Sequence, residues 1–317
     1  MIVSRHRIAT VVPLHNGSDF VVEALESVFG QTRQSDRVVV VDDGSSDDGV
    51  DAIARAFPQH GIEVLQTVNG GQSRARNLGV QAASDCDLIA FLDQDDAWYP
   101  EHLEVLEGVF LKSSLRRLAY VYSNLDQIDR EGRRIHQSLL DLIDGPRQKT
   151  KIYDLIGLDV FVLPSASLVD RTAFVSVGGF DEQLSGYEDD DLFVRLFLAG
   201  FDHAYVATPL SQWRIYGDSC SQSPRMRISR LRYAMKLIGM FPKDPAGGLD
   251  FPRDVVWPRF SKTLRQEIKR MMMAGNRRGC NELADDLICI AKATNRYDVK
   301  TWLKVANYRI RALLSAA

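Results

Sequence analysis

The sequence has 317 residues, enough for one large domain and an additional segment, and 45% of them are hydrophobic. No apolar run approaches the ~20 residues of a membrane span, and no signal-peptide pattern opens the chain, so we expect a cytoplasmic protein. The cysteines are scattered and lack zinc-ligand spacing, which predicts buried thiols or a reducing compartment rather than disulfides: Cys86, Cys220, Cys280 and Cys289.

Charge is distributed unevenly along the chain, although the net charge is only −3. Residues 1–224 contain 19 Lys and Arg against 34 Asp and Glu, a net charge of −15. Residues 225–317 contain 20 against 8, a net charge of +12. So abrupt a change is typical of a domain boundary, and we predict one domain over residues 1–224 followed by a basic region over residues 225–317.

The first hundred residues alternate between strand and helix patterns. β-Branched and apolar runs predict strands at residues 8–12, 37–41, 63–68 and 88–92. Helical spacing predicts helices between them, at residues 21–29 after a Ser18 N-cap, at residues 52–57 and at residues 73–83. Repeated β-α-β order predicts an α/β fold with a parallel sheet and right-handed crossovers.

Carboxylates follow two of these predicted strands. Asp42 and Asp43 come after residues 37–41, and the cluster Asp93-Gln94-Asp95-Asp96 comes after residues 88–92. Ligands of open α/β sheets bind at the carboxyl ends of strands, and hard cations such as Mg²⁺ and Mn²⁺ prefer oxygen ligands. One cluster alone would equally fit a solvated loop or a helix N-terminus. Two acidic strand ends on one edge favour a metal together with a phosphorylated ligand.

The basic region has helical periodicity and no low-complexity tract. We predict helices over residues 226–240, 261–273, 282–294 and 299–314. We place a loop between the first two because it is rich in proline: Pro242, Pro245, Pro252 and Pro258.

The last predicted helix interleaves aromatic and apolar residues with basic ones. A basic amphipathic helix of this kind suits peripheral contact with an anionic membrane. Docking on the acidic residues 1–224, or homo-oligomerisation through the C-terminal helices, explains the same pattern equally well. We do not expect nucleic-acid binding, because no recognisable motif accompanies the charge.

Six sequence blocks follow one another along the chain. They are VPLHN at residues 12–16, VVDDGSSD at 40–47, NGGQSRARNLG at 69–79, FLDQDD at 91–96, GGFDE at 178–182 and EDDDLFVRL at 188–196. In this order and at this spacing they resemble the family-2 glycosyltransferases with the GT-A fold, in which the last two blocks lie on the acceptor side. The resemblance covers roughly residues 7–221. Single motifs are weak evidence, whereas a series in order at plausible spacing is specific.

The resemblance implies a GT-A fold, a mostly parallel sheet flanked by helices, here with a C-terminal helical extension. It implies a metal-dependent inverting glycosyltransferase that moves a sugar from a nucleoside diphosphate sugar to an acceptor hydroxyl. The acceptor would be a saccharide or a lipid-linked saccharide in bacterial surface polysaccharide or glycolipid synthesis. Residues 1–97 would bind the nucleotide and residues 98–224 the acceptor, with Mn²⁺ or Mg²⁺ acting as a Lewis acid on the departing diphosphate.

The resemblance also assigns donor-site residues. Asp95 becomes the direct metal ligand, with Asp93 and Gln94 beside the nucleotide-sugar. Asp42 would accept a hydrogen bond from the uracil ring, which favours a UDP-sugar. The remaining nucleotide-sugar positions before residue 100 are Pro13, His15, Asn69 and Arg76.

The general base must be a carboxylate within reach of the acceptor hydroxyl. Residues 188–191 are all acidic, and neighbours on a helix differ by ~100°, so they cannot all face one pocket. The family pattern points to Asp189. Asp190 and Asp191 also fit charges that the dipole favours at a helix N-terminus.

The sequence departs from the family at one informative place. Many members have Arg-x-His followed by a Ser-rich loop over the diphosphate, and Arg214 and Ser219 fit this pattern as nucleotide-sugar-binding residues. Tyr216 stands where His is common, and neutral Tyr is a poor metal ligand although it donates hydrogen bonds. The metal would then depend on Asp95, the phosphates and water.

Two other function classes fit part of the pattern. A nucleotidyltransferase also uses an α/β sheet, a metal and acidic strand ends, but it usually opens with a Gly-rich phosphate loop that is missing here. A non-catalytic nucleotide-sugar-binding module is the other alternative, and Tyr216 gives it some support. Metal-dependent hydrolysis of a UDP-sugar would separate an enzyme from a binding module.

Overall fold

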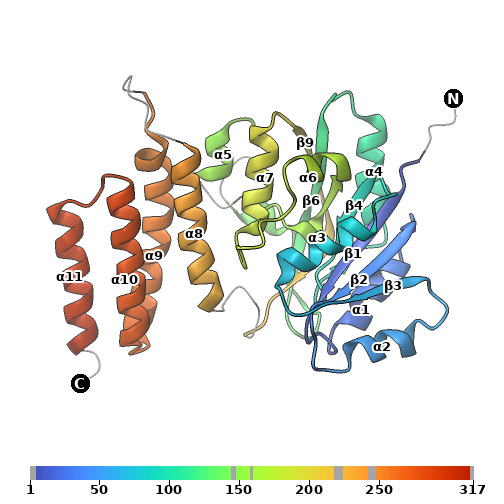
Figure 1. Cartoon of the computed structure of the whole chain (residues 1–317), viewed down its shortest axis with the longest axis horizontal. Helices are drawn as coiled ribbons and strands as arrows, with labels where there is room; N and C mark the ends of the chain where they lie inside the picture. Colours follow the sequence, from blue (N-terminus) through green and yellow to red (C-terminus); the bar gives the residue numbers. More distant parts are fainter. Residues whose placement is uncertain (1–4, 144–147, 158–159, 218–223, 242–247, 315–317) are drawn as a thin grey trace. The chain divides into compact units, whose positions relative to one another are not determined.

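The computed structural model describes residues 5–143, 148–157, 160–217, 224–241 and 248–314 (Figure 1). The chain divides into two compact units. The first unit consists of residues 1–152 and 160–222, and the second consists of residues 153–159 and 223–317. The short segment 153–159 therefore groups with the second unit, although it lies within the region where the sequence places the acceptor-binding part.

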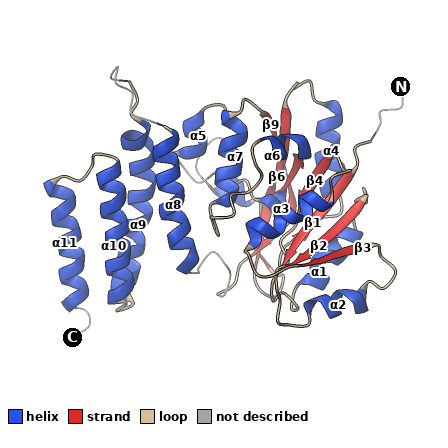
Figure 2. Cartoon of the chain, viewed as in Figure 1, coloured by secondary structure: helices blue, strands red, loops and turns tan. Residues whose placement is uncertain are grey.

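The first unit is built on one curved sheet of mixed direction (Figure 2). Its strand order is β3-β2-β1-β4-β8-β6-β9-β5, with β7 paired to β6. The strands are β1 (Ile8–Leu14), β2 (Arg37–Asp42), β3 (Ile62–Gln66), β4 (Leu88–Phe91), β5 (Ala97–Trp98), β6 (Leu118–Ile128), β7 (Arg134–His136), β8 (Ser167–Asp170) and β9 (Asp202–Arg214).

The four strands predicted from the first hundred residues are parallel to one another, as expected. Beyond β4 the direction changes, because β8 pairs antiparallel with both β4 and β6. The sheet is thus parallel on the side of the acidic strand ends and mixed on the other. The predicted fold class, a GT-A-type sheet flanked by helices with C-terminal helices, is confirmed.

Alternation along the buried strands explains how helices cover both faces of the sheet. In β2, Val38 and Val40 join the large core beneath α1, α2 and α4, whereas Val39 and Val41 pack with Ala75 of α3 on the opposite face. The helices of this unit are α1 (Val21–Phe29), α2 (Gly49–Ala56), α3 (Gln72–Ala82), α4 (His102–Lys112), α6 (Arg171–Ser176) and α7 (Glu188–Leu198).

Glycine allows α3 to lie directly on the sheet. A Cβ placed at Gly79 would be 2.3 Å from Val11 Cγ1 of β1, so no larger residue fits without moving the helix. This close approach fixes the position of the first turns of α3, which carry residues of the candidate site.

One predicted cap is wrong. The Ser18 N–H donates to Asp47 Oδ2 at 2.8 Å, and α1 begins three residues later at Val21 without a side-chain cap. Because the Asp47 carboxylate binds the Ser18 backbone, this segment joins the loop after β2 rather than the helix.

The second unit is helical. It contains the short α5 (Ile152–Ile156), whose first residue belongs to the other unit, then α8 (Pro224–Met240), η4 (Pro252–Val256), α9 (Trp257–Met273), α10 (Arg277–Ala293) and α11 (Val299–Leu314). The expectation that Pro252 and Pro258 lie in a loop is wrong, because they occupy the first turns of η4 and α9, where a missing N–H costs little. Pro242 and Pro245 lie outside the described residues.

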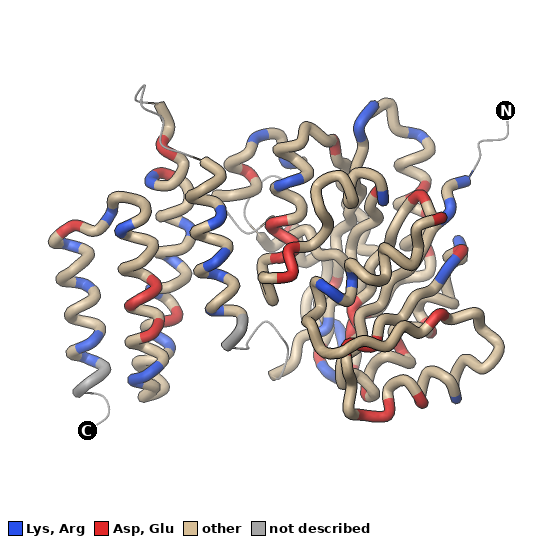
Figure 3. Tube along the Cα trace, in the orientation of Figure 1, with Lys and Arg blue, Asp and Glu red and all other residues tan. Residues whose placement is uncertain are grey.

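Charge differs between the units as the sequence indicates, and Lys and Arg recur along α8 to α11 (Figure 3). Within the described part of the chain, no helix combines the length and the apolar composition needed to cross a bilayer.

Candidate functional site

The parallel strands β1, β2 and β4 bring their following loops to one edge of the sheet, as the sequence predicts. There Gln94 joins the loop after β4 to the loop after β1. Its Oε1 accepts from the His15 N–H at 2.7 Å, and its Nε2 donates to the His15 carbonyl at 3.2 Å. A Cβ at Gly17 would lie 2.5 Å from Gln94 Cδ, so the glycine makes room for this clamp.

The exposed His15 ring connects the same loop to two others. Its Nδ1 lies 3.0 Å from the Asp43 carbonyl, and its Nε2 lies 3.1 Å from Asn69 Nδ2. Two residues assigned to nucleotide-sugar binding, His15 and Asn69, therefore contact each other. Pro13, also assigned to that role, is buried within β1.

The two carboxylates after β2 have different partners, and both are buried. Asp42 Oδ1 accepts from the Ser45 N–H at 2.9 Å. Asp43 accepts from the N–H groups of Gly70 and Gly71 at 2.8 and 2.7 Å, so it fixes the loop that precedes α3. The uracil-binding role of Asp42 stays a prediction.

Arg76 lies at the centre of the site. Its guanidinium, with the side chain 1% exposed, donates to Asp93 Oδ1 through one terminal nitrogen and to Glu188 Oε1 at 2.9 Å through the other. Burial alone would lower the pKa of Arg76, but the charges of Asp93 and Glu188 raise it above its ordinary value. Arg76 was assigned to nucleotide binding; here its head group is enclosed and holds two carboxylates in place.

Asp95 and Asp96 point to different surroundings. The half-buried Asp95 accepts from the Tyr216 O–H at 2.9 Å, whereas the buried Asp96 accepts from Ser165 Oγ at 2.5 Å and from the Arg214 N–H at 3.0 Å. Burial and then the charge of Asp93 raise the pKa of Asp95, although the Tyr216 hydrogen bond lowers it. Burial and the charges of Asp95 and Asp93 raise the pKa of Asp96 well above its ordinary value.

Arg214 also differs from its assignment to nucleotide-sugar binding. Its side chain is 1% exposed, and its Nε donates to the Asp95 carbonyl at 2.8 Å. One terminal nitrogen donates to the carbonyls of Asp129 and Arg130, and the other to Glu23 Oε1 at 2.7 Å. The guanidinium thus supports the loop after β4 from beneath. Ser219, assigned to the same role, lies outside the described residues.

The acidic run at the start of α7 contains one residue unlike the other three. Glu188 is buried against Arg76, Asp190 accepts from the Val160 N–H at 3.2 Å, and Asp191 pairs with Arg195 at 2.7 Å. Asp189 is the partly exposed member of the four, and its Oδ1 accepts from the Asp190 N–H at 2.8 Å. Of these carboxylates, Asp189 is therefore the best placed to meet a ligand.

The residues present fit a divalent cation. The charge of Asp93 acts on Asp95, and a hard cation relieves such repulsion between carboxylates. In the described ranges, however, no three His, Cys, Asp or Glu side chains are arranged to hold a metal. Further ligands would have to come from a bound phosphate and from water, as is usual for Mg²⁺ at phosphate-binding sites.

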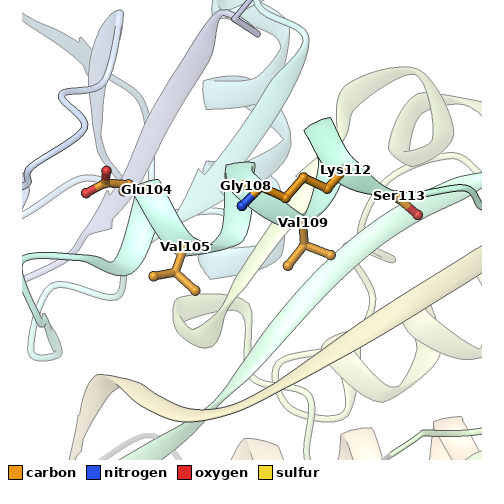
Figure 4. Close-up of a pocket in the computed structure, with 6 residues that line it drawn as sticks. All are labelled: Glu104, Val105, Gly108, Val109, Lys112 and Ser113. Atoms are coloured by element: carbon orange, nitrogen blue, oxygen red, sulfur yellow. The ribbon is translucent and has the colours of Figure 1, made fainter. Parts of the chain in front are cut away.

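A surface groove elsewhere does not belong to this site. It is lined by residues from a single helix and its C-cap: Glu104, Val105, Gly108, Val109, Lys112 and Ser113 (Figure 4). None of these residues was assigned to a function.

Sequence reasoning singled out Tyr216 without giving it a partner in the protein, and it gave Glu188 no role in the site. Glu188 is the partner of Arg76, and Tyr216 is the partner of Asp95. The signal for Tyr216 was its place three residues after Trp213, where the family often has His. For Glu188 the signal was its place beside the predicted base, but the distance of 112 positions from Arg76 gave no hint of contact.

Comparison with protein families gives one clear match. The family model "Glycosyl transferase family 2" matches residues 10–175, which include β1 to β4 and both acidic strand ends. Residues 178–196, with the candidate base, lie beyond the matched range.

Curated relatives have names of the same kind. An "Uncharacterized glycosyltransferase" of Rickettsia bellii is 27% identical over 217 residues, which is 67% of this chain and 29% of that protein. The "Succinoglycan biosynthesis protein ExoW" of Rhizobium meliloti is 37% identical over 101 residues, 31% of this chain and 32% of that protein. The chain thus matches about a third of the length of each.

Solved structures share the fold. The S. aureus TarS fragment 1–349 in complex with UDP-GlcNAc aligns over 98% of this chain and 89% of its own, with a TM-score of 0.68 and 16% identity. The mannosyltransferase PcManGT of Pyrobaculum calidifontis in complex with GDP-Man and Mn²⁺ aligns over 99% and 87%, with a TM-score of 0.53 and 18% identity.

Proposed function

Because the chain belongs to glycosyl transferase family 2, we propose that it is a metal-dependent inverting glycosyltransferase that uses a UDP-linked sugar. The observation that carries the proposal is the buried chain Asp93–Arg76–Glu188. It joins the carboxylates at the end of β4 to the helix that carries Asp189. A transferase needs these two functions, donor binding and proton removal, at neighbouring positions.

Asp95 would hold the metal, with Asp93 beside the nucleotide-sugar, and the metal would supply a Lewis acid for the departing diphosphate. Asp42, His15, Pro13 and Asn69 would contact the nucleoside, and residues 1–97 would form the donor part. The UDP-GlcNAc and GDP-Man complexes of the two similar structures support a nucleoside diphosphate sugar as the donor class, and the Mn²⁺ of the second supports a divalent ion. The predicted hydrogen bond of Asp42 to uracil favours UDP.

Asp189 would remove the proton from the acceptor hydroxyl, which then attacks the anomeric carbon and displaces the diphosphate in one step. A single displacement inverts the configuration at that carbon. We assign acceptor binding to residues 98–224. The succinoglycan name of one relative supports a saccharide acceptor in polysaccharide synthesis. The free, buried thiols of Cys86 and Cys280 fit a reducing compartment such as the cytoplasm.

Thermal unfolding with candidate donors tests the proposal. We expect UDP with Mn²⁺ to raise the unfolding temperature more than GDP or dTDP with Mn²⁺, because a ligand at 100 times its Kd stabilises the folded state by about 2.7 kcal/mol. The Asp95→Ala protein should lose the part of the rise in unfolding temperature that depends on Mn²⁺. The exposed Asp51→Ala is a control with the same charge change. An Asp95→Ala protein that responds like the wild type would contradict the metal assignment.

Hydrolysis of UDP-sugars then separates an enzyme from a binding module. We expect slow, Mn²⁺-dependent release of UDP from one of a panel of UDP-sugars without acceptor, and none with a chelator. Stabilisation by UDP without any turnover would favour a non-catalytic module.

A further inference from the structure

Helix α11 packs on α10 through one of its faces. Val305 and Thr301 are buried there, the Cys280 thiol lies 3.9 Å from the Tyr308 carbonyl, and Arg309 pairs with Asp285. These contacts account for the side of α11 that faces its own unit (Figure 1).

A second apolar face of α11 is exposed. Its members are Val299, Trp302, Leu303 and Ile310, with exposed fractions of 74%, 54%, 55% and 55%. Their spacing of three, four and seven or more positions places them within an arc of roughly 100° on the helix. We call these four residues the outer face of α11. Large apolar side chains gathered on one exposed stripe mark an interaction site, whereas single ones are ordinary.

A row of cations lies beside the outer face. Lys300, Lys304 and Arg311 are exposed and lie on neighbouring positions of the helix surface. The helix itself contains no Asp or Glu, and Asp298, directly before it, interacts with Lys300.

We propose that the outer face and basic row of α11 dock on an anionic lipid surface. An interfacial helix buries its apolar stripe at the headgroup boundary while Lys and Arg contact lipid phosphates, and Trp prefers this boundary. A second copy packed through the same helix would bring its own three cations and the single flanking acid Asp298, so most of the repulsion between the basic rows would remain. Anionic lipid satisfies both the stripe and the cations.

The size of the effect follows from the charges. Each Lys or Arg near an anionic surface strengthens binding roughly fivefold, so three predict a preference for anionic over neutral vesicles on the order of a hundredfold. Salt should weaken the preference because it screens exposed charges.

Co-sedimentation of the full chain with vesicles, without any sugar nucleotide, tests the inference independently of the proposed function. We expect binding to equal parts phosphatidylglycerol and phosphatidylcholine, and little binding to phosphatidylcholine alone. Lys300→Gln with Lys304→Gln should lose most of the preference. Lys262→Gln with Lys269→Gln removes the same charge from exposed positions of α9 and should change little.

The apolar stripe is tested separately. Trp302→Ser with Leu303→Ser should reduce binding, whereas Met273→Ser, at a residue 89% exposed on α9, should not. In the wild type, the Trp emission should shift to shorter wavelength with anionic vesicles only, and Trp302→Ser should abolish the shift, because Trp98 and Trp257 are already buried and Trp213 is half-buried.

Equal binding to both vesicle types, or unchanged binding of the Trp302 and Leu303 variant, would overturn the inference. Sedimentation velocity tests the alternative that a second copy of the chain occupies the outer face. A dimer that the same two substitutions dissociate, in a protein indifferent to lipid, would assign the outer face to a second copy of the chain.

Discussion

The first unit contains two acidic clusters, residues 93–96 after β4 and residues 188–191 at the start of α7. The contacts that hold neighbouring carboxylates in place differ between the two clusters. At the strand end, an arginine, a tyrosine and a serine each bind one carboxylate. At the helix start, three of the four carboxylates are buried and bonded, and Asp189 stays partly exposed. The partners of the other three carboxylates therefore single out Asp189 as the accessible one, which the sequence does not show.

Arg76 links the two clusters electrostatically, because it binds a carboxylate of each. Four experiments test the clusters and the buried groups of this unit, from the largest expected effect to the smallest.

Asp189→Asn changes the residue of the helix cluster that we propose as the general base. We expect transfer to fall by roughly 10²–10⁴-fold, the usual contribution of a positioned general base. Donor affinity, measured by calorimetry with UDP and Mn²⁺, should not change, because Asp189 is not among the donor carboxylates. An Asp189→Asn enzyme with full activity would place the base elsewhere on the acceptor side.

Arg76→Met should break the link between the clusters. Removing one partner of a buried ion pair leaves uncompensated charges, so we expect the free energy of unfolding to fall by about 3–5 kcal/mol in urea titrations. Arg55→Met is the matched control, since its 3.0 Å pair with Asp48 is exposed and such pairs contribute about 1 kcal/mol or less. Equal losses of unfolding free energy in the two variants would show that the buried pairs of Arg76 stabilise the fold no more than an exposed pair does.

Lowering the pH should have opposite effects on the stability contributed by the strand-end cluster and by buried histidine. The raised pKa of Asp96 means that protonation relieves a cost of folding, so this group favours the folded state as pH falls. Burial instead lowers the pKa of His102 to about 3. Its contribution is complete above the unfolded pKa of about 6.5 and is lost as pH falls towards 3.

Because of His102, the free energy of unfolding should therefore fall by about 2 kcal/mol between pH 6.5 and pH 5. Urea unfolding of wild type and His102→Gln at both pH values measures this difference, since the variant should lack that part of the pH dependence. His203, whose pKa burial lowers to about 4, should behave in the same way. Parallel pH profiles for wild type and variant would contradict the assignment.

Tyr216→Phe should have the smallest effect, within the strand-end cluster. The change removes the O–H that binds Asp95 but keeps the ring, which packs on Phe20 at 5.3 Å between centroids. Loss of such a supporting hydrogen bond weakens metal binding about tenfold at the low end of the usual range. Titration with Mn²⁺ followed by electron paramagnetic resonance measures the affinity without turnover. Unchanged affinity would make Tyr216 a packing residue only.

Local patterns predicted the parallel half of the sheet because each strand there is a buried apolar run with a helix between it and the next. Antiparallel β8 could not be predicted, since its four residues carry no periodic signal and its direction depends on partners 80 positions away. Ser18 was misjudged for a similar reason: Asp47, distant in sequence, competes for its backbone.

In the site, residue types were predictable and burial was not. The predicted strand ends placed Asp93 and Asp95 at one edge of the sheet, as the structure has them, whereas the roles assigned to them and to Asp189 stay predictions. Arg76 and Arg214 looked like ligand-binding cations, yet both guanidinium groups are buried and donate to the protein's own oxygen atoms. Only the tertiary structure shows whether an arginine faces a ligand or a neighbouring carboxylate.

The sharing of Arg76 restricts how this protein could be recombined. A chimera that takes α7 from a relative must also receive an acid at position 188, or Arg76 loses one of its two carboxylate partners. Segments exchanged to alter specificity should therefore carry residues 72–96 and 184–196 together.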